Sequence, residues 1–249
     1  MNKFDLVVFD LDGTLAPSKS FLDQEMSNLI MRLLEKKKVV VISGGSYNQF
    51  KLQFLKRLPE SSNSFSNLIL MPTSGTRMDI WDGEKWVEKY AELLTAEEKE
   101  KIMKALTEAL EESNYEKPDK TFGPLIEDRG SQITFSALGQ EAPLELKVIW
   151  DKDHKKRDKI AIPLRSKIPE FAVAVNAYTS IDITHKGVDK GYAINKLRDV
   201  LNIPIEKMLF IGDGLFEGGN DYATVATGVE TQAVKGPEET KKVIQELLE

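Results

Sequence analysis

Short apolar runs and amphipathic segments alternate over the first 75 residues of the chain. Apolar runs at residues 6–9, 39–42 and 68–71 have the length and composition of buried strands. Between them, residues 22–38 carry apolar side chains at helical spacing, and residues 46–58 repeat that spacing. Strands that alternate with helices in this way predict a parallel sheet of the α/β class.

The pattern changes over the middle of the chain, where helices and antiparallel strands are expected instead of crossovers. Thr95 and Glu98 have the spacing of a capping box, which predicts the start of a helix. The expected elements are a hairpin at 78–90 around Asp82-Gly83, a helix at 94–113, an antiparallel strand at 124–138 and a second hairpin at 170–184. This region therefore resembles an α+β insert.

The strand–helix alternation returns after residue 186. A helix over residues 189–201 precedes an apolar strand at 207–212, and the last helix has Pro237 in its first turn. The sequence thus predicts a Rossmann-like parallel-sheet core domain, formed by residues 1–82 and 187–249. An α+β cap domain, residues 83–186, is inserted into it.

Composition limits the class of protein. The chain has 249 residues, is 41% hydrophobic and contains no cysteine, so it can form a large core but no disulfide or thiolate metal site. Its formal net charge of −6 does not favour a nucleic-acid partner. The start lacks the pattern of a signal peptide, and no apolar run approaches the roughly 18 residues of a membrane helix. We expect a cytoplasmic protein with no membrane partner.

Unusual polar residues follow the predicted strands. Asp10 and Asp12 end the first strand, and a serine- and glycine-rich turn, residues 43–46, ends the second. Asp213 and Asp221 follow the strand at 207–212, and Lys190 begins the helix before it. Ligands of parallel sheets bind at the carboxyl ends of the strands, so these groups are expected to lie together.

Four carboxylates at one edge would repel one another unless a cation joined them. Hard oxygen ligands without nearby histidine or cysteine point to Mg²⁺. The hydroxyl of Ser43 and the amides of Gly44 and Gly45 form a suitable cradle for phosphate, and Lys190 adds positive charge. These groups suit phosphoryl transfer, in which one carboxylate is the nucleophile and a second moves the proton.

The motifs "VVFDLDGTL", "VISGG", "DKGYAI" and "IGDGLFEGGND", in this order, resemble those of the haloacid dehalogenase superfamily. The resemblance implies that Asp10 is the nucleophile and Asp12 the general acid and base. Ser43 and Lys190 would bind phosphate, and Asn220 would contact it. Asp213 would hold Mg²⁺ with Asp10 and the main-chain carbonyl of Asp12, supported by Asp221.

The position of the insert is that of a type 2B cap, and the chain is similar to the eukaryotic-type phosphomannomutase family. The similarity is carried by "LIEDRG", "PLELKVIWDKD", "TSIDITHKGVDKGYAI" and the double glycine of "GGND". It implies exchange of a phosphoryl group between positions 1 and 6 of mannose or glucose, as in the interconversion of mannose 6-phosphate and mannose 1-phosphate. It also implies a cap that binds the distal phosphate and homodimers formed through caps. Expected cap contacts are Arg129, Lys147, Ser180 and Asp182.

Two departures leave alternatives open. Gln140 and Lys147 occupy positions where the family has arginines, so the site for the distal phosphate is weakened, and a sugar-phosphate phosphatase is an alternative. A non-catalytic phosphosugar-binding module is a further alternative function. Arg129 could instead form an ion pair with Glu127 or Asp128.

Two further expectations concern packing. Most charges of residues 147–167 are expected to form a solvated helical face, and the tryptophans are expected to pack the cap: Trp81, Trp86 and Trp150.

Overall fold

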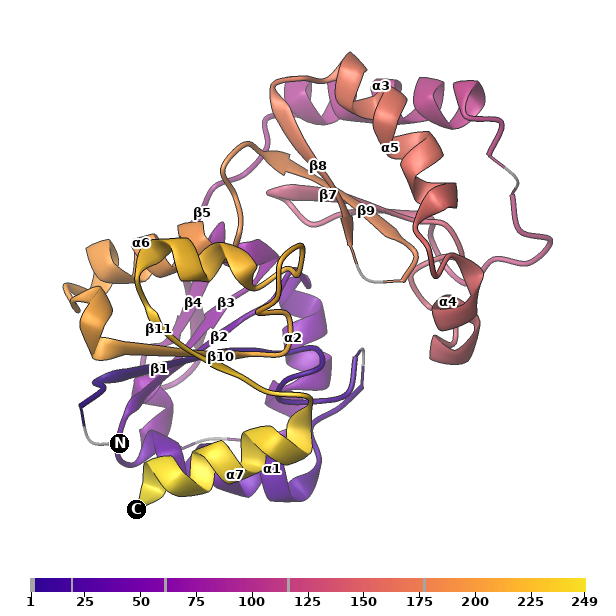
Figure 1. Ribbon diagram of the computed structural model, residues 1–249. Coiled ribbons are helices and arrows are strands. Elements are labelled where there is room, and N and C mark those ends of the chain that lie inside the picture. Colours follow the sequence, from indigo (N-terminus) through magenta and orange to yellow (C-terminus); the bar gives the residue numbers. More distant parts are fainter. Residues whose placement is uncertain (1–2, 19, 61, 116, 177) are drawn as a thin grey trace. The chain divides into compact units, whose positions relative to one another are not determined.

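The computed structural model describes residues 3–18, 20–60, 62–115, 117–176 and 178–249. The chain divides into two compact units (Figure 1). The first, called the core unit here, comprises residues 1–91 and 188–249, and the second, called the cap unit, comprises residues 92–187. Within the described residues, none of the helices combines the length and apolar composition that crossing a membrane requires.

A seven-stranded sheet forms the centre of the core unit, in the order β11-β10-β1-β2-β3-β4-β5. Neighbouring strands from β11 to β3 are parallel, whereas β4 and β5 are antiparallel to their neighbours. The strands are β1 (Leu6–Asp10), β2 (Lys38–Ile42), β3 (Leu68–Met71), β4 (Arg77–Trp81), β5 (Trp86–Ala91), β10 (Met208–Gly212) and β11 (Glu230–Ala233). The predicted α/β class is confirmed.

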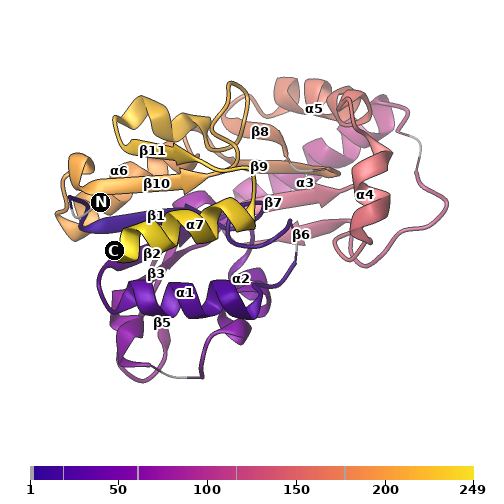
Figure 2. The same ribbon diagram turned by 60° about the horizontal axis from the view of Figure 1, so that its bottom comes forward.

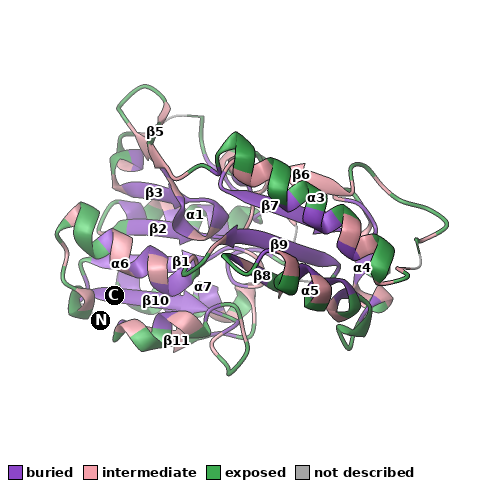
Figure 3. Ribbon diagram, turned by 90° about the horizontal axis from the view of Figure 1, so that it is seen from above, coloured by how far each residue is buried: buried purple, intermediate pink, exposed green. Residues whose placement is uncertain are grey.

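Helices cover both faces of this sheet because its central strands are apolar on both sides. Val7 and Phe9 of β1 face the helices α1 (Gln24–Leu34), α2 (Tyr47–Gln53) and α7 (Pro237–Leu248). Leu6 and Val8 face α6 (Lys190–Leu201). Figure 2 shows α1 and α7 side by side, and Figure 3 shows β1, β2 and β10 buried except for Lys38 at the start of β2. Strands buried on both faces are typical of parallel sheets.

The hairpin of β4 and β5 belongs to the core unit, so the observed division lies nine residues beyond the predicted boundary at residue 82. Ile80 of β4 pairs with Ile69 of β3, which extends the sheet by two strands. Trp81 and Trp86 contact each other and Phe65 at ring-centroid distances of 5.5–5.8 Å. The expectation that these two tryptophans pack the cap is therefore wrong.

The cap unit has an antiparallel sheet in the order β6-β7-β9-β8, as the α+β prediction requires. Ile133, Phe135, Ile181 and Ile183 of this sheet share a core with its helices, so one face is apolar. The elements are α3 (Ala96–Glu112), β6 (Ile126–Asp128), β7 (Gln132–Ser136), α4 (Leu144–Trp150), α5 (Lys155–Lys167), β8 (Phe171–Asn176) and β9 (Ser180–His185). The predicted capping box of Thr95 and Glu98 starts α3.

Short 3₁₀ helices complete the connections of the core unit. One of them, at Thr73–Gly75, follows β3 at the carboxyl edge of the sheet, and another, at Tyr222–Thr227, follows Asp221. The others are Leu55–Arg57, Asn63–Asn67 and Ile205–Lys207.

Candidate active site

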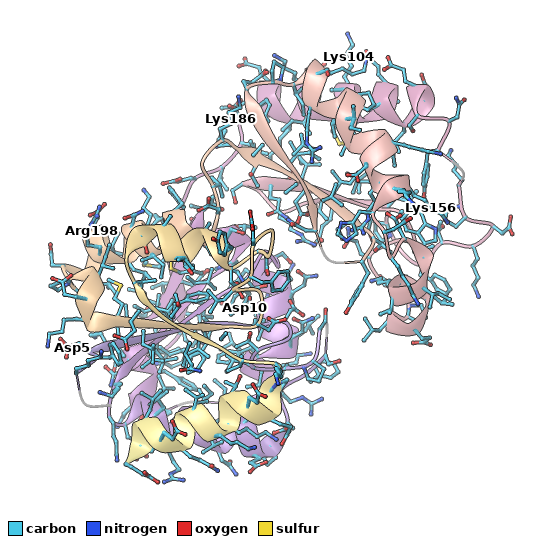
Figure 4. The ribbon with its side chains drawn as sticks, viewed as in Figure 1. Asp5, Asp10, Lys104, Lys156, Lys186 and Arg198 are labelled. Atoms are coloured by element: carbon cyan, nitrogen blue, oxygen red, sulfur yellow. The ribbon has the colours of Figure 1, made fainter. Side chains whose placement is uncertain are left out.

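Asp10 is the last residue of β1 and lies at the carboxyl edge of the core sheet, where Figure 4 labels it. Its side chain is buried, and its Oδ1 accepts a hydrogen bond of 2.5 Å from Nζ of Lys190, the first residue of α6. The same ammonium forms an ion pair with Asp221, which is fully buried. Three residues that are far apart in the sequence thus meet at the carboxyl edge of the sheet. Their positions relative to the predicted strands had led us to expect this.

Asp213 and Asp221 follow β10, the strand beside β1. The Thr14 hydroxyl donates to Oδ1 of Asp213 over 3.0 Å and accepts from the Asp213 amide over 3.1 Å. Oδ2 of Asp221 accepts from the amide of Gly214 over 2.8 Å. Carboxylate oxygens of Asp10, Asp213 and Asp221 all lie within 4.8 Å of one another. Thr14 was not singled out from the sequence, although it belongs to the quoted motif "VVFDLDGTL".

Gly13 is required where the Asp10 and Asp213 segments approach. Its φ is +88°, which L residues rarely adopt. A Cβ at this position would lie 2.4 Å from Oδ2 of Asp213. The motif glycine therefore allows the turn after β1 and the close approach of a carboxylate.

The donor set fits a divalent cation. Asp10, Asp213 and Asp221 offer hard oxygen ligands, and the single ammonium of Lys190 leaves this cluster with excess negative charge. Mg²⁺ prefers carboxylate oxygens and water over nitrogen or sulfur ligands. Thr14 orients one of these carboxylates by a hydrogen bond, as outer ligands of metal sites commonly do.

Burial and charge act on Asp10 and Lys190 together. Burial raises the pKa of Asp10 to about 8 against the opposing Lys190 ammonium, and the Asp221 carboxylate adds to the rise. Burial lowers the pKa of Lys190, but Asp10 and Asp221 outweigh it, and the net direction is upward. Lys190 therefore stays an ammonium, and a bound divalent cation would favour the ionised form of Asp10.

The predicted phosphate cradle lies in the turn after β2. The Ser43 hydroxyl accepts a 3.0 Å hydrogen bond from the Gly45 amide and lies 3.5 Å from Oδ2 of Asp12. The backbone carbonyls of Ser43 and Gly45 accept hydrogen bonds of 2.9 and 3.0 Å from the amides of Ser74 and Thr73. Those two residues have positive φ values of 55° and 48°, a strained conformation for a β-branched threonine. No sequence pattern had indicated that this loop supports the cradle.

Asn220 lies in the loop between β10 and the helix at Tyr222–Thr227. Its side chain is exposed and lies close over Gly214, where an added Cβ would come 2.2 Å from its Oδ1. Asn220 thus lies in the loop that carries two of the metal-binding candidates, Asp213 and Asp221.

The cap candidates lie in the cap unit. Arg129 forms an ion pair of 2.8 Å with Glu127, and its guanidinium lies 3.5 Å from Oε1 of Gln140. Lys147 is buried, and its ammonium donates to the backbone carbonyl of Gln140 over 2.9 Å. The alternative pairing of Arg129 with Glu127 is thus present. Lys147 does not belong to the solvated face expected for this charged segment.

Ser180 and Asp182 lie on the same face of β9, opposite the apolar face of the sheet. Asp182 accepts hydrogen bonds from Thr134 and Asn176. These two neighbours were not predicted from the sequence, although alternation along β7 and β9 could have placed Thr134 on this face.

Comparisons with known proteins agree with the motifs. A family model described as haloacid dehalogenase-like hydrolase matches residues 7–223. A phosphomannomutase of Encephalitozoon cuniculi is 26% identical over 98% of this chain and 93% of its own length. A phosphomannomutase of Saccharomyces cerevisiae is 27% identical over 97% of this chain and 93% of its own length.

Solved structures are similar in fold. A haloacid dehalogenase-like hydrolase from Bacteroides thetaiotaomicron has a TM-score of 0.67 at 14% identity, over 98% of this chain and 99% of that one. A C-terminally truncated IMP-nucleotidase of Plasmodium falciparum has a TM-score of 0.70 at 17% identity, over 99% of this chain and 72% of that one. At such identities the likeness concerns the fold alone.

Proposed function

The chain belongs to the haloacid dehalogenase-like hydrolase family, and from this premise we propose that it transfers a phosphoryl group between a hexose phosphate and the Asp10 carboxylate. Membership makes it an enzyme of the phosphotransferase or phosphatase kind. One arrangement carries the proposal: buried Asp10 contacts the Lys190 ammonium and lies within 4.8 Å of two further carboxylates. A nucleophile, a fixed cation and ligands for a divalent ion are what phosphoryl transfer needs.

Each step is assigned to a residue of the core unit. A carboxylate oxygen of Asp10 attacks phosphorus, and the bond to the leaving oxygen breaks as Asp12 donates a proton to it. Asp12 then removes a proton from the acceptor hydroxyl or from water, which attacks the aspartyl-phosphate and frees Asp10. Lys190 offsets the negative charge of the phosphoryl oxygens.

The remaining core residues hold the phosphate and the metal. Ser43, Gly44, Gly45 and Asn220 are the proposed phosphate contacts. Asp10, Asp213 and Asp221 would hold Mg²⁺ with the main-chain carbonyl of Asp12. When bound, Mg²⁺ supplies positive charge that offsets carboxylate repulsion and neutralises phosphoryl oxygens.

The preferred activity is that of a phosphomannomutase, which interconverts mannose 6-phosphate and mannose 1-phosphate. It is supported by relatives of that name at 26% and 27% identity over nearly the full chain. Arg129, Lys147, Ser180 and Asp182 remain the proposed cap contacts to the phosphosugar. Ser180 and Asp182 share one face of β9, as contacts to one ligand would.

A specific observation favours sugar-phosphate hydrolysis as the second candidate. Mutase chemistry passes through a bisphosphate, so it needs cations for a second phosphate. The Arg129 guanidinium is paired with Glu127, and the Lys147 ammonium donates to the carbonyl of Gln140. Both candidate cations are engaged within the cap, which would weaken binding of a second phosphate.

Product analysis separates the two activities. The protein is incubated with Mg²⁺ and mannose 6-phosphate, with and without a hexose bisphosphate. Formation of mannose 1-phosphate supports the mutase, and formation of free phosphate alone supports the phosphatase. If neither product forms, the proposal is contradicted. Asp10→Asn is expected to reduce turnover by more than about 10³-fold. Asp5, an exposed aspartate directly before the same strand, provides the control: Asp5→Asn should retain turnover.

We also propose a homodimer formed through cap units. Leu146 and Ile149 of α4 and Ile162 of α5 expose large apolar side chains in this unit, and such residues are frequent at subunit interfaces. Light scattering of the wild type and of Ile149→Glu tests this: the variant should be monomeric, and a monomeric wild type would overturn it.

A further inference from the structure

The cap sheet has a polar face opposite its apolar one. Ile133 and Phe135 of β7 and Ile181 and Ile183 of β9 join the apolar core. Gln132, Thr134, Ser180 and Asp182 alternate with them along the two strands. Burial of such polar groups is costly unless they are hydrogen-bonded. Their hydrogen bonds therefore show what this face is arranged to hold.

Asp182 is the charged centre of that face. Its Oδ1 accepts a 2.7 Å hydrogen bond from the Thr134 hydroxyl, and its Oδ2 accepts one of 2.9 Å from the Asn176 amide. Among the described residues, Asp182 has no ion-pair partner within 4.0 Å. It is 9% exposed, and a carboxylate has about four acceptor positions, so two remain.

The two donors are themselves fixed. Nε2 of Gln132 donates to the Thr134 hydroxyl over 2.8 Å, so the single proton of that hydroxyl is directed at Asp182. The backbone carbonyl of Asn176 accepts a 2.8 Å hydrogen bond from Arg157. The Arg157 side chain is fully buried and paired with Asp151 over 2.8 Å. A chain of contacts thus runs from a buried ion pair to the Asp182 carboxylate.

We propose that Thr134 and Asn176 are positioning residues that hold Asp182 as an acceptor for the hydroxyl groups of the sugar. The inference rests on the proposed function, in which a phosphosugar is the substrate. A carboxylate held by neutral donors repels phosphate but accepts hydrogen bonds from hydroxyl groups. The neighbouring Ser180 hydroxyl forms no hydrogen bond with the described residues, so it is also available to a polyol.

Matched variants and two substrates test this. Thr134→Val removes the hydroxyl at nearly constant volume, Thr134→Ser keeps it, and Asn176→Ala removes the amide donor. With Mg²⁺ present, kcat/KM is measured for mannose 6-phosphate and for p-nitrophenyl phosphate, which has no sugar hydroxyls. We expect Thr134→Val and Asn176→Ala to lose about tenfold for the hexose phosphate only. Thr134→Ser should stay close to the wild type, and thermal unfolding verifies that each variant is folded.

The outcomes separate this inference from the proposed function. Equal losses on both substrates, or no loss on either, would overturn the positioning role while leaving phosphoryl transfer intact. A wild type that cleaves p-nitrophenyl phosphate but neither isomerises nor hydrolyses mannose 6-phosphate overturns both. If the wild type turns over neither substrate, calorimetric titration with mannose 6-phosphate still decides. Unchanged affinity in Thr134→Val overturns the inference, and about tenfold weaker binding supports it.

Discussion

Asp12 differs from Asp10 in its surroundings, and that difference predicts a different result on substitution. Asp10 is buried against Lys190, whereas Asp12 is only partly buried and lies near the Ser43 hydroxyl. Loss of a general acid and base slows turnover by about 10²–10⁴-fold. We expect Asp12→Ala to lower kcat in this range while the inhibition constant of inorganic phosphate changes little. A kcat equal to that of the wild type would remove the proton-transfer role.

Thr14 is expected to act on the metal through Asp213. Its hydroxyl donates to Asp213, and Thr14→Val removes that hydrogen bond without changing the volume of a fully buried site. Loss of an outer hydrogen bond of this kind typically weakens metal affinity by about 10–100-fold. The Mg²⁺ concentration for half-maximal activity should rise accordingly in Thr14→Val and stay near the wild type in Thr14→Ser. Equal behaviour of the two variants would contradict the role.

The sequence indicated some site residues and not others for a physical reason. Asp10 stood out because a charge at the end of an apolar strand is costly without a partner, and the structure supplies Lys190. Thr14 gave no such signal, since a threonine after a glycine turn is unremarkable. Asn176 depends on a contact from Arg157, nineteen positions earlier, and no local spacing reveals it.

At the scale of elements, the buried ion pair between Asp151 and Arg157 joins the end of α4 to the start of α5. Most charges of the stretch around it are exposed, as expected, but the side chains of Asp151 and Arg157 are fully buried. Asp151 also accepts from the amides of Lys156 and Arg157 at 2.9 and 3.1 Å. A pattern of charges shows which residues are ionisable, whereas burial depends on how the helices pack.

This pair predicts an acid-dependent loss of stability. Burial alone would raise the pKa of Asp151, but hydrogen bonds from Arg157 and two amides outweigh it and hold the pKa below its usual value. The stabilisation is therefore complete above the unfolded pKa of about 4 and is lost as pH falls through the lower folded value. Urea unfolding between pH 7 and 2 should show a shallower acid decline in Asp151→Asn. A decline as steep as that of the wild type would contradict the assignment.

Two controls accompany that measurement. Arg157→Met leaves a buried carboxylate without its partner and should cost about 3–5 kcal/mol at pH 7. Asp153→Asn disrupts an exposed ion pair with Lys155 and should cost less than about 1 kcal/mol.

Strands and helices were predicted correctly where the hydrophobic pattern of the sequence is unambiguous. β1, β2 and β10 are buried on both faces and appeared as continuous apolar runs. The hairpin of β4 and β5 was recognised but assigned to the wrong domain, because local alternation does not say which sheet a hairpin joins. The pairing of Ile80 with Ile69 decides that, and it is a tertiary contact.

At the scale of the whole molecule, the chain leaves the core unit after Ala91 and returns at Val188. All candidate metal ligands lie in the core unit, on segments from both of its parts: Asp10 precedes the cap, and Asp213 and Asp221 follow it. Joining these segments through one cation would couple Mg²⁺ binding to the stability of the core unit alone.

Hydrogen exchange with and without Mg²⁺ tests that coupling. A cation at 100 times its dissociation constant adds about 2.7 kcal/mol to the state that binds it. We expect Mg²⁺ to slow exchange in β1 and β10 and to leave β7 and β9 of the cap unit unchanged. Asp213→Asn should abolish the slowing of exchange by Mg²⁺. In EDTA the same variant should have a more stable core unit than the wild type, because one of the mutually repelling carboxylates is gone. Protection that persists in Asp213→Asn, or that extends equally to the cap unit, would place the Mg²⁺ site elsewhere.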